Sequence, residues 1–484
     1  MTVRTRQFGF AVVCITTIAV AVCGARPYAG GWNDGSRLAA VEAIADHGTF
    51  AIDDSIFVRP ADRATGAAAP YPTDPPHLLR EGTRDKLLIN GRFYSDKPYS
   101  VSLVLAGVYR VLQWCGLPRA AERPDLFCWI MTLLTSGAAY VLAVWLMFRT
   151  GRVLGLADRL NLLWTASFAF CTFAATYSRH VNNHVMLLAV LAAVVLQLAR
   201  LRQSPDRRRW TRSVWLGFLG SAALCLDPGG GPVLLICLSA YLAWTFRSVG
   251  PVVPFATGAA PLVLLQLGLN FGIGGVLIPI NMVAEYSNWP GSAFNTDNLT
   301  GFWRHSPGGF LLYAASMLFG KRGIVGHNLP MFLLIPAIGA MLRKPLSAHR
   351  EAWTGLAWCA GTWLLYAGLS NNSSGMCCSI RWFVPFLAPA YYVLAIDLSA
   401  NPERQRAFLT LSGWGGLMAA LMWQHGPWWS RMVPGYWFLV ASALVTWWII
   451  DRRATSARKS MQYEPERKTA HWRHDARLPV SPPT

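Results

Sequence analysis

The sequence predicts an all-α polytopic membrane protein with about twelve transmembrane helices and a large first exoplasmic loop that carries amphipathic interfacial helices. Of its 484 residues, 53% are hydrophobic and only 14% are charged, whereas soluble domains usually carry about a quarter charged residues. Several uncharged runs reach the ~18 apolar residues that span a bilayer. These runs cover residues 126–148, 160–178, 248–284 and 432–450.

The formal net charge of +19 would suggest a nucleic-acid partner for a soluble protein. Here the basic residues lie in short loops between apolar runs, as the positive-inside bias of membrane proteins requires. We therefore expect membrane lipid around the chain and no nucleic acid. The ten cysteines form no CxxC pair and no Cys/His spacing for zinc, so we predict no metal and no cofactor.

Charge placement sets the expected topology. If Arg4 and Arg6 are cytoplasmic, the acid-rich segment after the first apolar run lies outside. The stretch 99–114 decides the rest, because it is short for a span and its apolar residues form a single stripe. We predict that it lies in the outer interface. The stripe consists of Val101, Val104, Leu105, Val108, Val111 and Leu112.

The expected organisation follows from this choice, because a span at 99–114 would place the basic loop at 200–212 outside. We expect an integral protein of a bacterial inner membrane. Both termini should lie in the cytoplasm and the active site on the exoplasmic face. The tract 59–86 is expected to be an exposed loop. The predicted segments are a first span at 1–25, an exoplasmic loop with interfacial helices at 26–125, a transmembrane bundle at 126–272, a second exoplasmic loop at 273–328, a transmembrane bundle at 329–450 and a basic cytoplasmic tail at 451–484.

The segment after the first apolar run predicts a short amphipathic helix from about Asp34 to His47. It begins with "GGWNDGSRL", in which Asn33 and Asp34 are good N-cap residues. Gly48 is a natural C-terminal stop, and apolar residues recur at helical spacing before it. We expect the apolar face to rest on the membrane or on other spans, and Asp34 to face a water-filled vestibule.

Asp34 allows two interpretations. An aspartate at a helix start is a cap far more often than a catalyst, but a carboxylate in a vestibule is also a suitable general base. Glu42 and Asp46 are four residues apart on this helix and are expected to form a solvated face. Asp53 and Asp54 are expected in a turn.

Three further polar clusters lie in predicted exoplasmic positions. Polar residues between apolar runs are costly and tend to be functional, although helix capping or snorkelling would explain one or two of them. The clusters are "INGRFYSDKPYS" with Asp96 and Lys97, "TYSRHVNNHV" with Arg179, His180, Asn182, Asn183 and His184, and "GMCCSIRWFVPFLAP" with Arg381.

One acid and several cations on one membrane face suit glycosyl transfer from a polyprenyl-phosphate sugar. Arg and Lys would hold the donor phosphate and stabilise it as it leaves, and a carboxylate would take the proton of the acceptor hydroxyl. One carboxylate suffices for inversion. A retaining route needs a second carboxylate, for which Asp96 and Asp46 are both open.

The order of these features resembles the GT-C superfamily of integral-membrane glycosyltransferases, in particular the branch of protein O-mannosyltransferases and the lipid A aminoarabinose transferase. The resemblance implies that Asp34 is the catalytic base. The family motif [H/K]-P-P corresponds to Lys97 and Pro98, with Tyr99 in place of the second proline. The stretches "TYSRHVNNHV", "LFGKRGIVGHNLP" and "CSIRWFVPFLAP" are similar to family segments at outer span ends.

The resemblance also implies the other site residues. Lys97, Arg179 and Arg381 would bind the donor phosphate, and Arg37, Asp96, Asn183 and His184 would line the substrate. Two features depart from the family pattern. Gly35 follows Asp34 where the family often has a glutamate, and a basic tail of about 34 residues replaces a C-terminal periplasmic domain. We therefore expect the exoplasmic loops to recognise the acceptor, whether lipid, glycan or protein.

A transporter or lipid flippase is the alternative. The stretch "LCLDPGGGPVLL" interrupts an apolar tract with Asp227, and helices broken around a charge are typical of transporters. Two short spans that turn at the outer surface, with Asp227 exposed in the turn, explain the same stretch. A membrane subunit without catalysis is a third reading, which leaves the acid-rich first loop without a reason.

Overall fold

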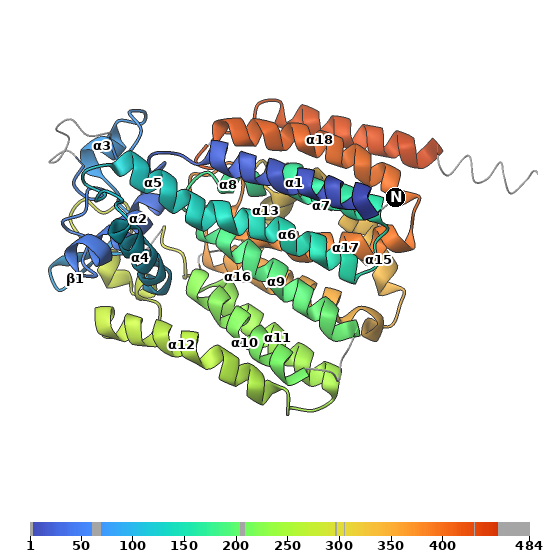
Figure 1. Cartoon of the computed structure of the whole chain (residues 1–484), viewed down its shortest axis with the longest axis horizontal. Coiled ribbons are helices and arrows are strands. Elements are labelled where there is room, and N and C mark those ends of the chain that lie inside the picture. Colours follow the sequence, from blue (N-terminus) through green and yellow to red (C-terminus); the bar gives the residue numbers. More distant parts are fainter. Residues whose placement is uncertain are drawn as a thin grey trace, which may run out of the picture.

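The structure is a computed structural model that describes residues 3–60, 69–203, 209–295, 298–303, 305–429 and 431–453. Long helices lie side by side along the longest axis of the molecule (Figure 1). They are α1 (Val3–Gly24), α5 (Pro124–Thr132) continued by the π-helical turn η2 (Leu133–Gly137) and α6 (Ala138–Val153), α7 (Asp158–Phe170), α9 (Asn183–Gln203), α10 (Arg209–Leu226), α11 (Gly230–Phe246), α12 (Val252–Gly274), α16 (Arg350–Leu369), α17 (Leu387–Ala400), α18 (Arg404–His425) and a last helix at 436–453.

Shorter elements connect these helices. They are α2 (Trp32–His47), α3 (His77–Glu81), β1 (Lys86–Ile89), β2 (Arg92–Ser95), α4 (Tyr99–Trp114), α8 (Ala174–Tyr177), η3 (Ile280–Met282), η4 (Ala284–Ser287), α13 (Pro307–Phe319), α14 (Ile324–His327), η5 (Leu329–Leu333), α15 (Leu334–Leu342), η6 (Leu346–His349) and η7 (Arg381–Phe386). The predicted all-α membrane fold is confirmed, with one antiparallel hairpin of β1 and β2 added.

Apolar helices form the bundle because their surfaces are apolar on nearly every side. By length and composition, four helices in the described part of the chain can cross a membrane, or five if one pair bent by 113° counts as a span. The predicted count of about twelve spans stays a prediction. The qualifying segments are Pro124–Val153, Asn183–Gln203, Val252–Gly274, Arg381–Ala400, and the bent pair of Pro307–His327 with Leu329–Leu342.

Glycine lets two of these helices approach closely. A Cβ on Gly217 of α10 would lie 1.9 Å from the Phe255 carbonyl oxygen of α12, and a Cβ on Gly258 would lie 2.0 Å from the Val214 carbonyl oxygen. Helices inside membranes use small residues in this way to bring backbones together. The packing fixes α12 against α10 at the edge of the bundle.

The two ends of the bundle differ. The elements α2, α3, β1 and α4 gather at one end, and the start of α1 and the end of helix 436–453 lie at the other (Figure 1). Phe10 near the start of α1 stacks on Phe148 near the end of α6, and Gln203 at the end of α9 donates to the Val153 carbonyl. The start of α1 and the ends of α6 and α9 therefore lie together, which collects arginine-bearing helix ends beside the N-terminus. The tail at 454–484 lies outside the described residues.

Helix α4 matches the predicted interfacial helix at both ends. Its small and aromatic face, with Tyr99, Ala106 and Tyr109, is buried. Part of its apolar stripe points away from the protein, where Val104 is 63% and Val111 is 52% exposed, whereas Leu105 and Leu112 pack against the core of the first loop. An outward apolar stripe at the end of a bundle is typical of a helix that lies in a membrane interface.

The tract 59–86 is not simply the expected exposed loop. It contains α3, and both Tyr71 and Leu78 are buried. Residues 61–68 of this tract lie outside the described residues. Apolar side chains of the tract pack under α2, so the first loop has a small core of its own.

The topology predicts different labelling at the two ends. Cys115 is exposed at the end of α4, and Lys344 is exposed near the end of α15. We consider sealed spheroplasts that express the Cys23→Ala protein. A membrane-impermeant maleimide should label Cys115 of this protein from outside. When Cys115→Ala is added to this background, a Lys344→Cys variant should be labelled only after permeabilisation, because the positive-inside bias places this loop in the cytoplasm. Labelling of Lys344→Cys in sealed spheroplasts would contradict the topology.

Candidate active site

The hairpin of β1 and β2 positions the lysine of the predicted motif. Asn90 and Gly91 form its two-residue turn with φ of 51° and 78°, as a type I′ turn requires. The register pairs the first residue of β1 with the last residue of β2. Asp85 and Asp96, which flank these strand ends, therefore come together, and Lys97 follows directly.

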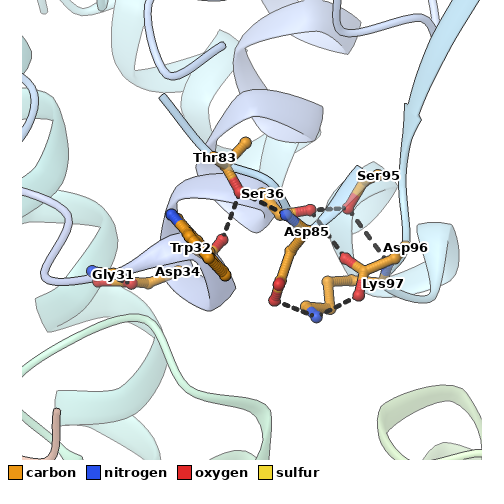
Figure 2. Close-up of polar contacts among 9 residues, drawn as sticks. All are labelled: Gly31, Trp32, Asp34, Ser36, Thr83, Asp85, Ser95, Asp96 and Lys97. Carbon is orange, nitrogen blue, oxygen red and sulfur yellow. Dashed lines mark hydrogen bonds and ion pairs between the residues drawn. The ribbon is translucent and has the colours of Figure 1, made fainter. Parts of the chain in front are cut away.

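Lys97 lies between two carboxylates. Its Nζ is 2.7 Å from Asp85 Oδ2 and 2.5 Å from Asp96 Oδ2, as Figure 2 shows. Ser36 of α2 donates to Asp96 Oδ1 over 3.1 Å and shares a 2.7 Å hydrogen bond with Ser95. Burial raises the pKa of Asp96, and so does the nearby Asp85, whereas Lys97 lowers it.

Asn33 links Lys97 to Arg381. With its carboxamide oxygen turned toward the cations, Asn33 accepts from Lys97 Nζ at 3.1 Å and from Arg381 Nη1 at 3.3 Å. The opposite orientation would place its NH₂ group against donors. Arg381 starts η7, and its guanidinium carbon lies 5.6 Å from the centroid of the Trp428 ring. The first loop and a late span entry thus meet at one point.

Arg37 completes a cluster of three cations. It lies one helical turn after Asn33 on α2, and it is buried. Burial lowers its pKa to about 10; Asp96, Asp85 and Asp34 raise that pKa, and Arg381 lowers it. We call Arg37, Lys97 and Arg381 the cation cluster.

Asp34 lies beside this cluster, but its position differs from the prediction. It is 1% exposed, so the expectation that it faces a water-filled vestibule is wrong. Its carboxylate accepts from the backbone N–H of Gly30 at 2.6 Å and of Gly31 at 2.9 Å, and it turns away from Lys97 (Figure 2). His180 Nδ1 lies 3.1 Å from its Oδ2.

The carboxylate turns this way because Asp34 caps the start of α2. The helix begins at Trp32 rather than at Asp34, with Gly31 as N-cap and Asp34 at the third helical position. A carboxylate there reaches back to the N-cap N–H. A Cβ on Gly30 would meet the His180 ring at 2.5 Å and the Trp428 ring at 2.5 Å, so these rings close over the carboxylate.

Gly35 departs from the family acid pair for a local reason. A Cβ there would lie 2.2 Å from Tyr71 Oη, and Tyr71 Oη is held by donation to the Phe57 carbonyl at 2.9 Å. No side chain fits in this space without moving the tyrosine. The tract around Tyr71 therefore excludes a second acid at this position.

The "TYSRHVNNHV" stretch divides between two places. Arg179 Nη1 donates to the Trp423 and Gln424 carbonyls at the end of α18, and within the described residues no hydrogen bond or ion pair joins its side chain to the cation cluster. The structure thus does not bring Arg179 to the predicted phosphate site. His184 lies within electrostatic range of the cation cluster, and the Asn183 amide donates to the Leu226 carbonyl at 2.7 Å.

The remaining acids of α2 do not form the expected solvated face. Glu42 is fully buried and accepts from Ser55 Oγ at 2.6 Å and from the Ile56 N–H at 3.1 Å. Asp46 is half-buried and accepts from Gln113 Nε2 of α4 at 2.6 Å. These acids hold the first loop together, because they pair with groups that would otherwise be unsatisfied. Asp53 lies in a turn, as predicted.

Asp227 lies in a turn between two helices, as the second reading of its stretch expects, but it is not exposed. It follows α10 directly, and α11 begins at Gly230. Asp227 is 4% exposed, and its Oδ1 accepts from Tyr366 Oη at 2.5 Å. The exposure expected for Asp227 is wrong because α16 packs over the turn through Tyr366.

Two site residues escaped the sequence reasoning. Asn33 was expected only to cap a helix, and Asp85 was one acid among many. The Asn90-Gly91 dipeptide is a strong hairpin signal, and it would have placed Asp85 opposite Asp96.

In the part of the chain that the structure describes, no three His, Cys, Asp or Glu side chains gather as metal ligands.

Comparison with solved structures shows that this chain shares its fold with a known protein. The solved structure that shows this is ArnT from Cupriavidus metallidurans in the apo state, which is similar over 91% of this chain and 76% of that chain, with a TM-score of 0.50 and 12% identity. ArnT bound to undecaprenyl phosphate has a TM-score of 0.49 and the same identity. No family model matches the chain, and no curated protein matches it.

Gly35 gives a test of the packing at the start of α2. We expect Gly35→Ala to lower the free energy of unfolding by about 1–3 kcal/mol, because the added methyl overpacks against Tyr71. The melting temperature of the detergent-solubilised protein measures this. Tyr71→Phe in the same chain should recover part of the loss. Gly107→Ala is the matched control, since its Cβ meets nothing within 4 Å, and it should not lower the melting temperature.

Asp96 gives a pH-dependent stability. Its folded pKa is raised above the ordinary value of 3.8, so its contribution is fully present below that pH and is lost as pH rises through the raised pKa. We expect the melting temperature of the wild type relative to Asp96→Asn to fall as pH rises from about 4 to about 7. A difference that grows over this range would contradict the assigned direction.

Proposed function

We propose that this chain is a membrane glycosyltransferase that moves a sugar from a polyprenyl-phosphate donor to an acceptor hydroxyl on the exoplasmic face. The observation that carries the proposal is the cation cluster, which lies beside a buried aspartate at one end of an apolar bundle. The fold supports it, because ArnT has this fold and one of its structures holds undecaprenyl phosphate. Fold alone does not establish function, so the proposal rests on the site.

The guanidinium groups are the best-placed phosphate ligands. The three N–H donors of Lys97 are taken by Asp85, Asp96 and Asn33. In contrast, the Nε atoms of Arg37 and Arg381 are buried and without a hydrogen-bond partner in the described residues. Guanidinium groups bind phosphate in a charge-assisted, often bidentate way. Arg37 and Arg381 would thus hold the phosphate, and Lys97 would add positive potential.

Asp34 is the proposed base. In a single displacement, the acceptor oxygen attacks the anomeric carbon, its proton passes to Asp34, and the bond to the donor phosphate breaks so that the phosphate leaves with the electron pair. Because the His180 and Trp428 rings close over Asp34, the acceptor reaches it only when one of them moves. A lipid, a glycan and a protein hydroxyl all satisfy this chemistry.

A retaining route would use a second carboxylate. Asp96 is the better placed of the two candidates, because it contacts Lys97 at 2.5 Å. Asp46 instead bonds to Gln113 and to Tyr109 of α4, at the far end of α2. The transporter reading loses its main support, since Asp227 lies between two helices and not inside a broken one.

Transfer of label tests the base. Purified full chain in detergent is mixed with radiolabelled undecaprenyl-phosphate-linked sugars, namely glucose, mannose and aminoarabinose, and with a membrane extract as acceptor. We expect Asp34→Asn to lower kcat by about 10²–10⁴-fold. Its melting temperature should also fall, because an amide offers one oxygen to the two N–H groups of Gly30 and Gly31 that the carboxylate caps. Asp125→Asn is the control, because that acid pairs with Arg123 away from the site. Full activity in Asp34→Asn would remove Asp34 as the base.

Binding of undecaprenyl phosphate tests the cation cluster. We expect Arg381→Ala to weaken binding by about 10–100-fold, which corresponds to the loss of charge-assisted hydrogen bonds. Lys97→Ala does not isolate a phosphate contact, because it leaves Asp85 and Asp96 without their cation. Arg123→Ala is the matched surface control and should bind as the wild type does. Equal affinity in Arg381→Ala and the wild type would exclude Arg381 from the phosphate site.

A further inference from the structure

The turn between α10 and α11 holds a carboxylate with one bonded and one unbonded oxygen. Asp227 Oδ1 accepts from Tyr366 Oη at 2.5 Å and from the Gly229 N–H at 3.0 Å. Asp227 Oδ2 is buried and has no hydrogen-bond partner among the described residues. Buried acceptors are normally paired, and each exception needs an explanation.

Glycine keeps space open beside this oxygen. A Cβ on Gly230 would lie 3.3 Å from Asp227 Oδ2 and 3.6 Å from Thr362 Oγ1. Thr362 of α16 is 1% exposed, and its hydroxyl also has no partner. A Cβ on Gly229 would meet Tyr366 Oη at 2.6 Å. Because residue 230 has no side chain, the unpaired Asp227 Oδ2 and Thr362 Oγ1 both border the same space beside Gly230.

Two further unpaired groups come from the start of α9. The Asn183 amide donates to the carbonyl of Leu226, the residue before Asp227, and its Oδ1 is left without a partner. His184 Nδ1 is likewise buried and unpaired. Tyr366, which donates to Asp227, stacks on Trp382 with ring centroids 4.3 Å apart, and Trp382 directly follows Arg381. The turn therefore lies near the cation cluster. We call Asn183, His184, Asp227 and Thr362 the turn cluster.

We propose that the turn cluster binds the hydroxyl groups of the donor sugar. This inference rests on the proposed function and deepens it. Three of its unpaired atoms are oxygens that accept hydrogen bonds, so they suit a ligand rich in O–H donors. The Asp227 carboxylate repels a phosphate. The cation cluster therefore binds the phosphate of the donor, and the turn cluster binds its sugar ring.

Thr362→Val separates ligand binding from a structural role. Valine has the shape of threonine and removes an unpaired buried hydroxyl, so the melting temperature should stay the same or rise. If the hydroxyl binds sugar, the KM for the best of the three labelled undecaprenyl-phosphate sugars rises about 2–10-fold. Affinity for sugar-free undecaprenyl phosphate should stay within about twofold whether or not the hydroxyl binds sugar, because the arginines bind the phosphate in the proposed site.

Asp227→Asn should raise the KM for the sugar donor more than Thr362→Val does, again without changing the affinity for sugar-free undecaprenyl phosphate. We expect its KM to rise about 10–100-fold with sugar-free binding unchanged, since hydrogen bonds to a charged group are stronger. Asp125→Asn is the carboxylate control and should change neither quantity. Unchanged KM in Thr362→Val and Asp227→Asn, with an active wild type, would overturn the turn cluster alone. A wild type that neither binds undecaprenyl phosphate nor transfers label would overturn the proposed function and this inference together.

Discussion

A single ammonium group, that of Lys97, connects the parts of the molecule that form the candidate site. It pairs with Asp85 and Asp96 across the open end of the hairpin and contacts Asn33 at the start of α2. Removing one partner of a buried ion pair is costly, about 3–5 kcal/mol, because the other charge stays unpaired. The hairpin, α2 and η7 are therefore held in one arrangement, with Arg381 reached through Asn33.

This arrangement keeps opposite charges close without neutralising all of them. Lys97 pairs with Asp85 and Asp96 of the first loop. Arg37 and Arg381 each keep an Nε–H donor without a partner among the described residues. Arg37 and Arg381 repel each other, and burial adds to that cost, so an anion placed between them would be stabilised. A phosphate diester at the membrane interface has the right charge. Asp34 is set apart by its capping bonds, so in the proposed reaction the base and the phosphate ligands are different groups.

Periodicity and charge in the sequence were enough for the membrane class, for helix 99–114 and for the helix that carries Asp34. They were not enough for burial. Glu42 and Asp227 were expected to be solvated because acids usually are, but each finds a hydroxyl partner from a segment distant in sequence. Arg179 was grouped with the cations because its stretch lies at a predicted outer span end, yet it stands in the turn after α8 and its side chain bonds to the end of α18. Such pairings depend on tertiary contacts that no local pattern contains.

The central claim is that Arg37 and Arg381 form the binding site for a lipid-borne phosphate. The most direct measurement is an experimental structure of the full chain with undecaprenyl phosphate bound. The account predicts phosphate oxygens about 3 Å from guanidinium nitrogens of both arginines, at the end of the bundle that carries α2. A phosphate bound at the end where α1 begins, or one held by neither arginine, would contradict the account.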